Sequence, residues 1–216
     1  MGKLKAIITT SLDGYVAGPD QSEENPLGVG GEELHEWMFP LKIWRESHGD
    51  EGGEVTASSP VVEGWSENVG AIIMGRNMFG GGPGPWAEDP WTGWWGDNPP
   101  YHVPVFVLTH HEREPLEMEG DTTFHFVTEG IESALDQARE AAGEADISVI
   151  GGANAIQQYL AAGLVDQLEI SISPRFLGGG ERLFDNLDGG PEGLECVELT
   201  CSPAVTHVRL ARSLPR

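Results

Sequence analysis

The stretch from Asp146 to Gly180 constrains the fold of this chain more than any other. Its parts follow one another as an apolar β-branched run, a pair of glycines, an apolar stripe at helical spacing and an alternating apolar run. These four parts are Ile147–Ile150, Gly151–Gly152, Ile156–Leu160 and Leu168–Ile172. The pattern predicts a β-turn-α-β unit of an α/β fold, in which Gly163 ends the helix.

The pair of glycines stands where a strand gives way to a helix. Glycine allows positive φ and a close approach of a ligand to the backbone, and the first N–H groups of a helix have no partner within it. The turn therefore predicts an anion site of phosphate size. The residues alone leave open a second interpretation, a tight turn with close helix packing.

Three further blocks accompany this stretch, namely SLDGYVAGPD near the N-terminus, AIIMGRNMF in the middle and ISPRFLGGGERLF after the second strand. With them the chain resembles the dihydrofolate reductase-like family, in particular the reductase domain of bacterial riboflavin biosynthesis and its stand-alone relatives. The resemblance implies an α/β fold with a mixed, mostly parallel central sheet flanked by helices. A C-terminal β-hairpin is expected from two alternating runs, at 194–201 and 204–211, and one domain is expected over residues 1–216.

The resemblance also implies an NADPH-dependent reductase. Its substrate would be a small heterocycle or imine, pterin-like or ribosylaminopyrimidine-like, as for a dihydrofolate reductase or a 5-amino-6-(5-phosphoribosylamino)uracil reductase. Turns that follow strand ends would hold the cofactor, because these ends share one edge of an open α/β sheet. The expected cofactor contacts are Thr10, Ala17, Gly75, Arg76, Asn77, Thr109, His110, Arg113, Gly151, Gly152, Ala153, Asn154 and Ile156.

The charge balance makes the few cations informative. The chain has 35 acidic and 12 basic residues, a formal net charge of −23. Such a surface repels nucleic acid and anionic membranes, so neither is expected as a partner. By the resemblance, Arg76 and Arg113 would reach the phosphates of the cofactor, the 2′-phosphate included, which favours NADPH over NADH. An alternative role for the acidic surface is solubility in a salty cytoplasm.

Residues 31–46 carry an apolar stripe at helical spacing, and Pro40 is expected to kink this helix. On a helical wheel Glu33 lies at the margin of the stripe, whereas His35 and Glu36 point away from it. The stripe consists of Leu34, Trp37, Met38, Leu41 and Trp44.

A reduction of a C=N bond needs a proton as well as a hydride, and partial burial raises the pKa of a carboxyl group toward neutrality. We therefore expect Glu33, half-buried at the stripe, to be the proton donor. Asp13, at the mouth of the first strand, is the second candidate. The alternative for Glu33 is a first-turn glutamate that favours the helix dipole.

Residues 80–101 hold many glycines and prolines and four tryptophans within ten positions, a mixture that no regular element tolerates. An exposed tryptophan cluster promotes aggregation, so we expect this loop to form the wall of a pocket or to be buried at a subunit interface. Of the two, we prefer the wall of a pocket.

Cys196 and Cys201 lie five residues apart in one expected strand. That spacing predicts opposite faces, no disulfide between them, and two buried thiols in a reducing compartment. No zinc-ligand spacing is present, so no metal is expected. The N-terminal apolar run is broken too early for a signal peptide, and no run approaches the roughly 20 residues of a membrane span. A soluble, cytoplasmic homodimer is expected.

Two other functions remain open. One is a non-catalytic nucleotide-binding module that has lost the acid. The other is an interaction protein that docks a partner through the Trp-rich loop 80–101.

Overall fold

The computed structural model describes residues 2–88 and 90–212 of the chain. The chain divides into two compact units. Unit 1 consists of Met1–Ala6 and Asn68–Val165, and unit 2 consists of Ile7–Glu67 and Asp166–Arg216. One domain over the whole chain remains a prediction.

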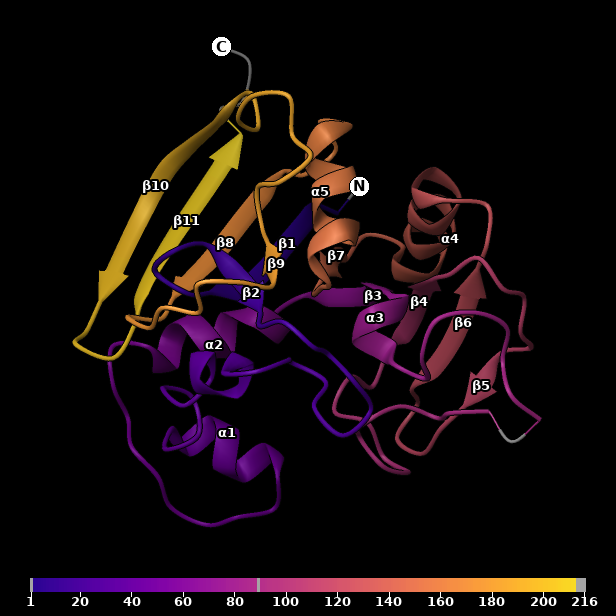
Figure 1. The fold of residues 1–216 in the computed structure, drawn as a ribbon, viewed down its shortest axis with the longest axis horizontal. Coiled ribbons are helices and arrows are strands. Elements are labelled where there is room, and N and C mark those ends of the chain that lie inside the picture. Colours follow the sequence, from indigo (N-terminus) through magenta and orange to yellow (C-terminus); the bar gives the residue numbers. More distant parts are fainter. Residues whose placement is uncertain (1, 89, 213–216) are drawn as a thin grey trace. The chain divides into compact units, whose positions relative to one another are not determined.

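Unit 1 is built on a mostly parallel sheet (Figure 1). Its strands lie in the order β1-β7-β3-β4-β6-β5, and only β5 is antiparallel to its neighbour among the described strands of this unit. The bounds are β1 (Leu4–Thr10), β3 (Val69–Gly75), β4 (Pro104–Leu108), β5 (Leu116–Glu117), β6 (Thr123–Val127) and β7 (Asp146–Val149). The middle of β3, Ala71–Met74, is buried throughout, as expected for a parallel strand covered on both faces.

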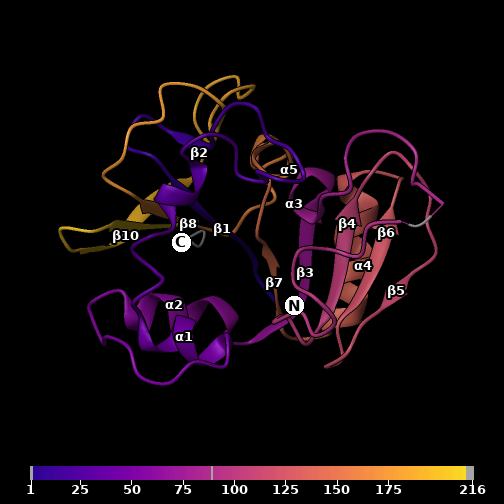
Figure 2. The same ribbon diagram turned by 60° about the horizontal axis from the view of Figure 1, so that its bottom comes forward.

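The described part of unit 1 contains three helices, namely α3 (Arg76–Phe79), α4 (Ile131–Ala142) and α5 (Ala153–Ala161). Helix α4 buries Ala134, Leu135 and Ala138, spaced as one helical stripe, and packs on β3, β4 and β7 (Figures 1 and 2). Helix α5 buries its predicted stripe, and Gly163 follows it with a φ of 66°, a backbone conformation that favours glycine. The β-turn-α part of the predicted unit is confirmed.

Unit 2 contains an antiparallel hairpin of β10 and β11. The strands of this unit lie in the order β10-β11-β8, with the C-terminal part of β1 next to β8. Figure 1 shows β10 and β11 as a long pair of strands beside β8. The bounds are β8 (Gln167–Ile172), β10 (Leu194–Cys201) and β11 (Thr206–Arg212). A short ladder joins β2 (Tyr15–Ala17) to β9 (Glu181–Arg182), which the sequence did not reveal. The predicted mixed, mostly parallel α/β fold with a C-terminal hairpin is confirmed.

The helical part of unit 2 differs from the single kinked helix predicted over residues 31–46. A 3-10 helix η1 (Gly31–Leu34) is followed by turns, then by α1 (Lys42–Ser47) and α2 (Ser59–Ser66). Pro40 has no N–H group and disfavours helical backbone in the residue before it, so the helix cannot run through this position. The apolar positions Leu34, Trp37, Met38 and Leu41 are nevertheless buried.

The two cysteines are exposed, so the prediction of buried thiols is wrong. A bulge between Cys196 and Glu198 shifts the register, and the two cysteines pair with Leu210 and Thr206, positions four apart on β11. Positions an even number apart in a strand share a face, so the predicted opposite faces are also wrong. Strand β10 exposes both its faces, which leaves its thiols in solvent.

The Trp-rich loop packs on the core of its own unit, and its expected role as the wall of a pocket stays a prediction. Trp86, Trp91 and Trp95 lie against the apolar cluster that contains Phe79 and Phe124. Three indole N–H groups of the loop donate to backbone carbonyl oxygens, which satisfies them within the chain. These bonds run from Trp86 to His111, from Trp91 to Phe79 and from Trp94 to Met78. Within residues 2–88 and 90–212, no helix is long and apolar enough to cross a membrane.

Candidate functional site

Unit 1 brings two of the predicted phosphate turns together. The N–H of Gly75, at the end of β3, donates to the carbonyl oxygen of Gly151 at 2.7 Å. Gly152 stands at the start of α5, after a cis Gly151–Gly152 peptide bond. A Cβ atom at position 75 would lie 3.4 Å from the nitrogen of Gly152 and 3.5 Å from the Cβ of Ala155. The two turns are therefore in backbone contact, and bulk at position 75 would press on the start of the helix.

Arg76 directly follows this contact and carries a half-buried guanidinium. Its Nε donates to the carbonyl oxygen of Gly80 and its Nη2 to that of Gly81, both at 2.9 Å. Its Cζ lies 3.2 Å from the ring centroid of Trp86, and its Nη1 is buried without a hydrogen-bond partner in the described part of the chain. Desolvation, followed by the charge of Arg113, lowers the pKa of Arg76.

Arg113 approaches the same indole. Its Cζ lies 4.7 Å from the centroid of Trp86 and 4.7 Å from that of Phe126, and its Nη1 donates to the carbonyl oxygen of Trp91 at 2.6 Å. Desolvation lowers the pKa of Arg113 as well. Within residues 2–88 and 90–212, no carboxylate forms an ion pair with Arg76 or Arg113. Two cations thus share one aromatic ring without a described anionic partner, which is a charge arrangement suited to an anion.

The other residues expected at the cofactor have varied surroundings. Thr109 is buried, and its Oγ1 accepts a bond from the N–H of His111, whereas His110 is exposed. Asn154 lies in the first turn of α5 and accepts a bond from Gln158. Ile156 is fully buried and its N–H donates to Gly152, so its side chain serves the core. Asn77 lies in α3 and Ala153 opens α5.

Two expected cofactor contacts belong to unit 2. Thr10 ends β1 and is buried, and its carbonyl oxygen accepts a bond from the N–H of Ser173 at 2.8 Å. Ala17 is buried in β2, opposite Glu181 of β9. Their role toward a cofactor stays a prediction.

Asp13 links the loop after β1 to the loop that contains Leu177 and Gly178. Its carboxylate accepts bonds from the N–H groups of Leu177 at 3.1 Å and Gly178 at 2.8 Å. A hydrogen bond from Ser11, with these backbone bonds, lowers the pKa of Asp13 to about 2 against the opposing effect of desolvation. The group is therefore ionised at neutral pH and carries no proton to donate. Its surroundings are those of a loop anchor.

Glu33 lies in η1 with a side chain that is 54% exposed, so the prediction of a half-buried acid is wrong. The helical wheel failed here because the backbone leaves the helix after Leu34. For the same reason His35 does not point away as predicted, and burial of its ring lowers its pKa to about 4. One oxygen of Glu33 lies 3.7 Å from Arg175, which also bonds Glu36 at 2.6 Å.

A cavity of about 550 Å³ lies within unit 2. Glu33, Glu36, Glu54 and Arg175 line it, together with Trp37 and hydroxyl groups that include the one of Ser58. The cavity therefore joins charged groups, an aromatic ring and hydroxyls in one wall.

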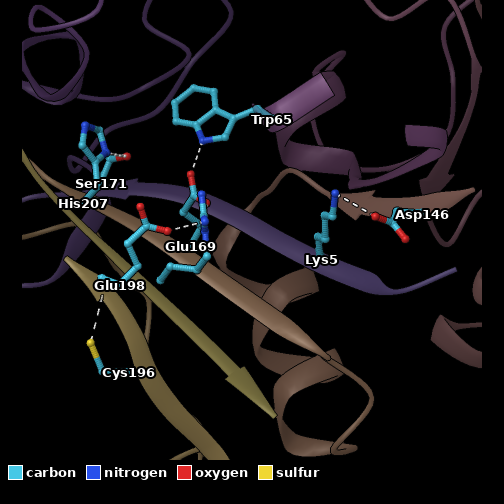
Figure 3. A network of polar contacts seen from close by, with 9 residues as sticks. Lys5, Trp65, Asp146, Glu169, Ser171, Cys196, Glu198 and His207 are labelled. Atoms are coloured by element: carbon cyan, nitrogen blue, oxygen red, sulfur yellow. Dashed lines mark hydrogen bonds and ion pairs between the residues drawn. The ribbon is translucent and has the colours of Figure 1, made fainter. Parts of the chain in front are cut away.

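A buried polar network adjoins this cavity through Ser58. The Nε2 of His207 lies 2.9 Å from the Oγ of Ser58. Its Nδ1 lies 2.9 Å from the Oγ of Ser171 (Figure 3). His207 is 3% exposed, and burial lowers its pKa to about 4, which keeps the ring neutral at pH 7. Its ring meets Trp37 edge-on at 5.0 Å between centroids. Sequence reasoning missed this histidine because an alternating strand gives no sign of which polar side chain is paired.

A second part of the network, also drawn in Figure 3, surrounds Glu169. This carboxylate is 4% exposed and accepts bonds from the indole N–H of Trp65 and, at 3.0 Å, from Arg209. A buried carboxylate with two such donors is satisfied, as burial of a charge requires. In the part of the chain that the structure describes, no group of three or more His, Cys, Asp or Glu side chains could hold a metal ion.

The arrangement of strands and helices is that of the dihydrofolate reductase-like fold. The chain is similar to the structure of a proposed riboflavin biosynthesis protein from Shewanella sp. PV-4, with 23% identity, 98% and 99% of the two chains covered and a TM-score of 0.61. The dihydrofolate reductase from Enterococcus faecalis, complexed with NADP(H), has 14% identity, 98% and 96% coverage and a TM-score of 0.51.

A third similar structure is a diaminohydroxyphosphoribosylaminopyrimidine deaminase/5-amino-6-(5-phosphoribosylamino)uracil reductase from Thermotoga maritima. It has 13% identity and a TM-score of 0.55, and the match covers 98% of this chain but 57% of that one. At these identities the likeness shows the fold. No curated protein sequence matches significantly. The RibD C-terminal domain family matches residues 3–207, so the chain belongs to that family.

Proposed function

We propose that the chain is an NADPH-dependent reductase that acts on a small heterocyclic or imine-bearing substrate, pterin-like or ribosylaminopyrimidine-like. The observation that carries the proposal is the pair of guanidinium groups, Arg76 and Arg113, which share Trp86 without a carboxylate partner in the described part of the chain. Family membership and the fold it shares with an NADP(H) complex support it. The finer substrate identity is part of the proposal.

The residues of unit 1 fit such a cofactor. The buried Nη1 of Arg76 has no described partner, and the adjoining backbone at Gly75 is close to the glycine turn, since a Cβ there would lie 3.4 Å from the nitrogen of Gly152. Arg76 and Arg113 would hold phosphate groups, and the turn at Gly151 and Gly152 would offer its backbone to the pyrophosphate. When bound, the cofactor supplies the hydride, and the chain supplies binding and orientation.

Replacing Arg76 with glutamine is expected to weaken NADPH binding by about ten- to a hundredfold, since a hydrogen bond to a charged group is worth about 1.5–3 kcal/mol. NADH, which lacks the 2′-phosphate, should lose much less. Calorimetric titration of both cofactors measures the difference. Arg139→Gln is the control: Arg139 is half-buried and pairs with the exposed Asp136 on α4 of the same unit, so its loss should leave both affinities unchanged. Equal losses for NADPH and NADH would show that Arg76 does not bind the 2′-phosphate.

Glu33 remains the candidate proton donor, because its carboxylate lines the cavity of unit 2, whereas the carboxylate of Asp13 is bound by the N–H groups of Leu177 and Gly178. Glu33→Gln is expected to lower turnover by roughly a hundredfold, the usual contribution of a positioned acid, and to leave the affinity for NADPH unchanged. Glu32→Gln, an exposed neighbour in η1, should retain turnover. An unchanged rate in Glu33→Gln would assign the proton to water.

Two alternatives are separated by simple observations. A non-catalytic nucleotide-binding module would bind NADPH and turn over no substrate. An interaction protein would need its tryptophans free, yet Trp86, Trp91 and Trp95 pack on the core of unit 1. Cytoplasmic localisation and a homodimer remain predictions.

A further inference from the structure

The cavity of unit 2 is lined by more carboxylates than cations. Glu33, Glu36 and Glu54 contribute three negative charges, and Arg175 is the one lysine or arginine among the described residues that line it. Arg175 is already bound to Glu36 at 2.6 Å and lies 3.7 Å from Glu33. A phosphate that entered would therefore meet a net negative wall whose guanidinium is engaged, in a chain of net charge −23.

The remaining wall offers flat apolar surface and hydroxyl groups. Trp37 and three prolines, at positions 40, 174 and 203, line the cavity with rigid apolar groups that suit a planar ring. Ser58 also lines it, and His207 holds the Ser58 hydroxyl at 2.9 Å. The indole N–H of Trp37 is buried and has no acceptor in the described part of the chain. A buried unpaired donor is destabilising, so an acceptor that reached this N–H would be stabilised.

We infer that this cavity binds a planar heterocycle that carries amino groups and no phosphate. Amino N–H groups match the three carboxylates and ring carbonyls match the hydroxyl donors, whereas a phosphate meets a net negative wall whose one guanidinium is bound to Glu36 and lies close to Glu33. The inference rests on the proposed function in that it takes the occupant to be the substrate. It selects, among ribosylaminopyrimidines, the dephosphorylated form.

A matched pair of probes tests this inference, namely 5-amino-6-ribosylaminouracil and 5-amino-6-(5-phosphoribosylamino)uracil. They differ by the phosphate alone. In calorimetric titrations of the full chain without cofactor, the dephosphorylated probe should bind at least about tenfold more tightly at low salt. The difference should shrink in high salt, because the repulsion is screened. Tighter or equal binding of the phosphorylated probe, or no binding of either, would overturn the inference.

A double variant and a control variant test whether the carboxylates of the cavity cause this difference in affinity. In Glu36→Gln/Glu54→Gln two negative charges are removed and Arg175 loses its closer partner, so the phosphorylated probe should gain affinity and the tenfold difference should nearly vanish. Glu63→Gln, an exposed position of α2 outside the cavity, should keep the difference. An unchanged difference in the double variant would contradict the inference. Because no cofactor is present, these outcomes are independent of the NADPH titrations that test the proposed function.

Discussion

Phe79→Ala should lower the free energy of unfolding by about 3–5 kcal/mol, the usual cost of removing a fully buried aromatic side chain. Phe79 is 0% exposed, and its ring lies 5.9, 5.1 and 5.3 Å from the centroids of Trp86, Phe124 and Phe126. It therefore joins the Trp-rich loop to the sheet of unit 1. The cavity left by the substitution would loosen both.

Urea unfolding, followed by circular dichroism and by tryptophan emission, measures this loss. The emission of the folded variant should shift to longer wavelength, because the loop tryptophans gain water. Phe176→Ala, at a side chain 73% exposed, should stay within about 0.5 kcal/mol of the parent chain. A loss below about 1 kcal/mol for Phe79→Ala would show that the loop does not depend on this ring.

The second large effect is a dependence of stability on pH that originates at His207. Its pKa is about 4 in the folded chain, against 6.5 when unperturbed. Between these two values the unfolded chain binds more protons than the folded one, so the free energy of unfolding falls as pH falls from about 6.5 to about 4. The contribution of His207 can reach about 3 kcal/mol, and below pH 4 it changes no further. His35 contributes in the same direction.

The variant His207→Asn isolates this contribution. It should be less stable at pH 7, since the bonds to Ser58 and Ser171 are disturbed, but its stability should fall less between pH 7 and pH 4.5. Carboxylates titrate in both proteins, so their contributions cancel when the pH dependence of the variant is subtracted from that of the parent chain. His110→Asn, at an exposed position, should keep the parent dependence. Equal pH dependence in the parent chain and His207→Asn would exclude His207 as its source.

The sequence predicts the fold where periodic pattern and turn residues agree. The strand at 146–149, the glycine turn and helix α5 were all foreseeable, because an apolar run, a paired glycine and a terminal Gly163 specify the same local structure. The contact between Gly75 and Gly151 is a consequence of the neighbouring parallel strands β3 and β7, and the phosphate role of these turns stays a prediction.

The sequence predicts less where long-range contacts decide. Four of the five stripe residues, Leu34, Trp37, Met38 and Leu41, are buried as expected, yet Pro40 and the turns around it break the helix and expose Glu33. The charge state of Asp13 depends on N–H groups more than 160 positions away in the chain, at 177 and 178. Such partners leave no local signal, so the charge state of Asp13 could not be predicted from the sequence.

The central claim, a nicotinamide cofactor held by the arginine pair of unit 1, is tested most directly by calorimetric titration of the unmodified chain. We expect saturable binding of NADPH at one site per chain, at least about tenfold tighter than that of NADH, because only NADPH brings a 2′-phosphate to Arg76 and Arg113. Absence of saturable heat with NADPH, or equal affinity for the two cofactors, would contradict the account.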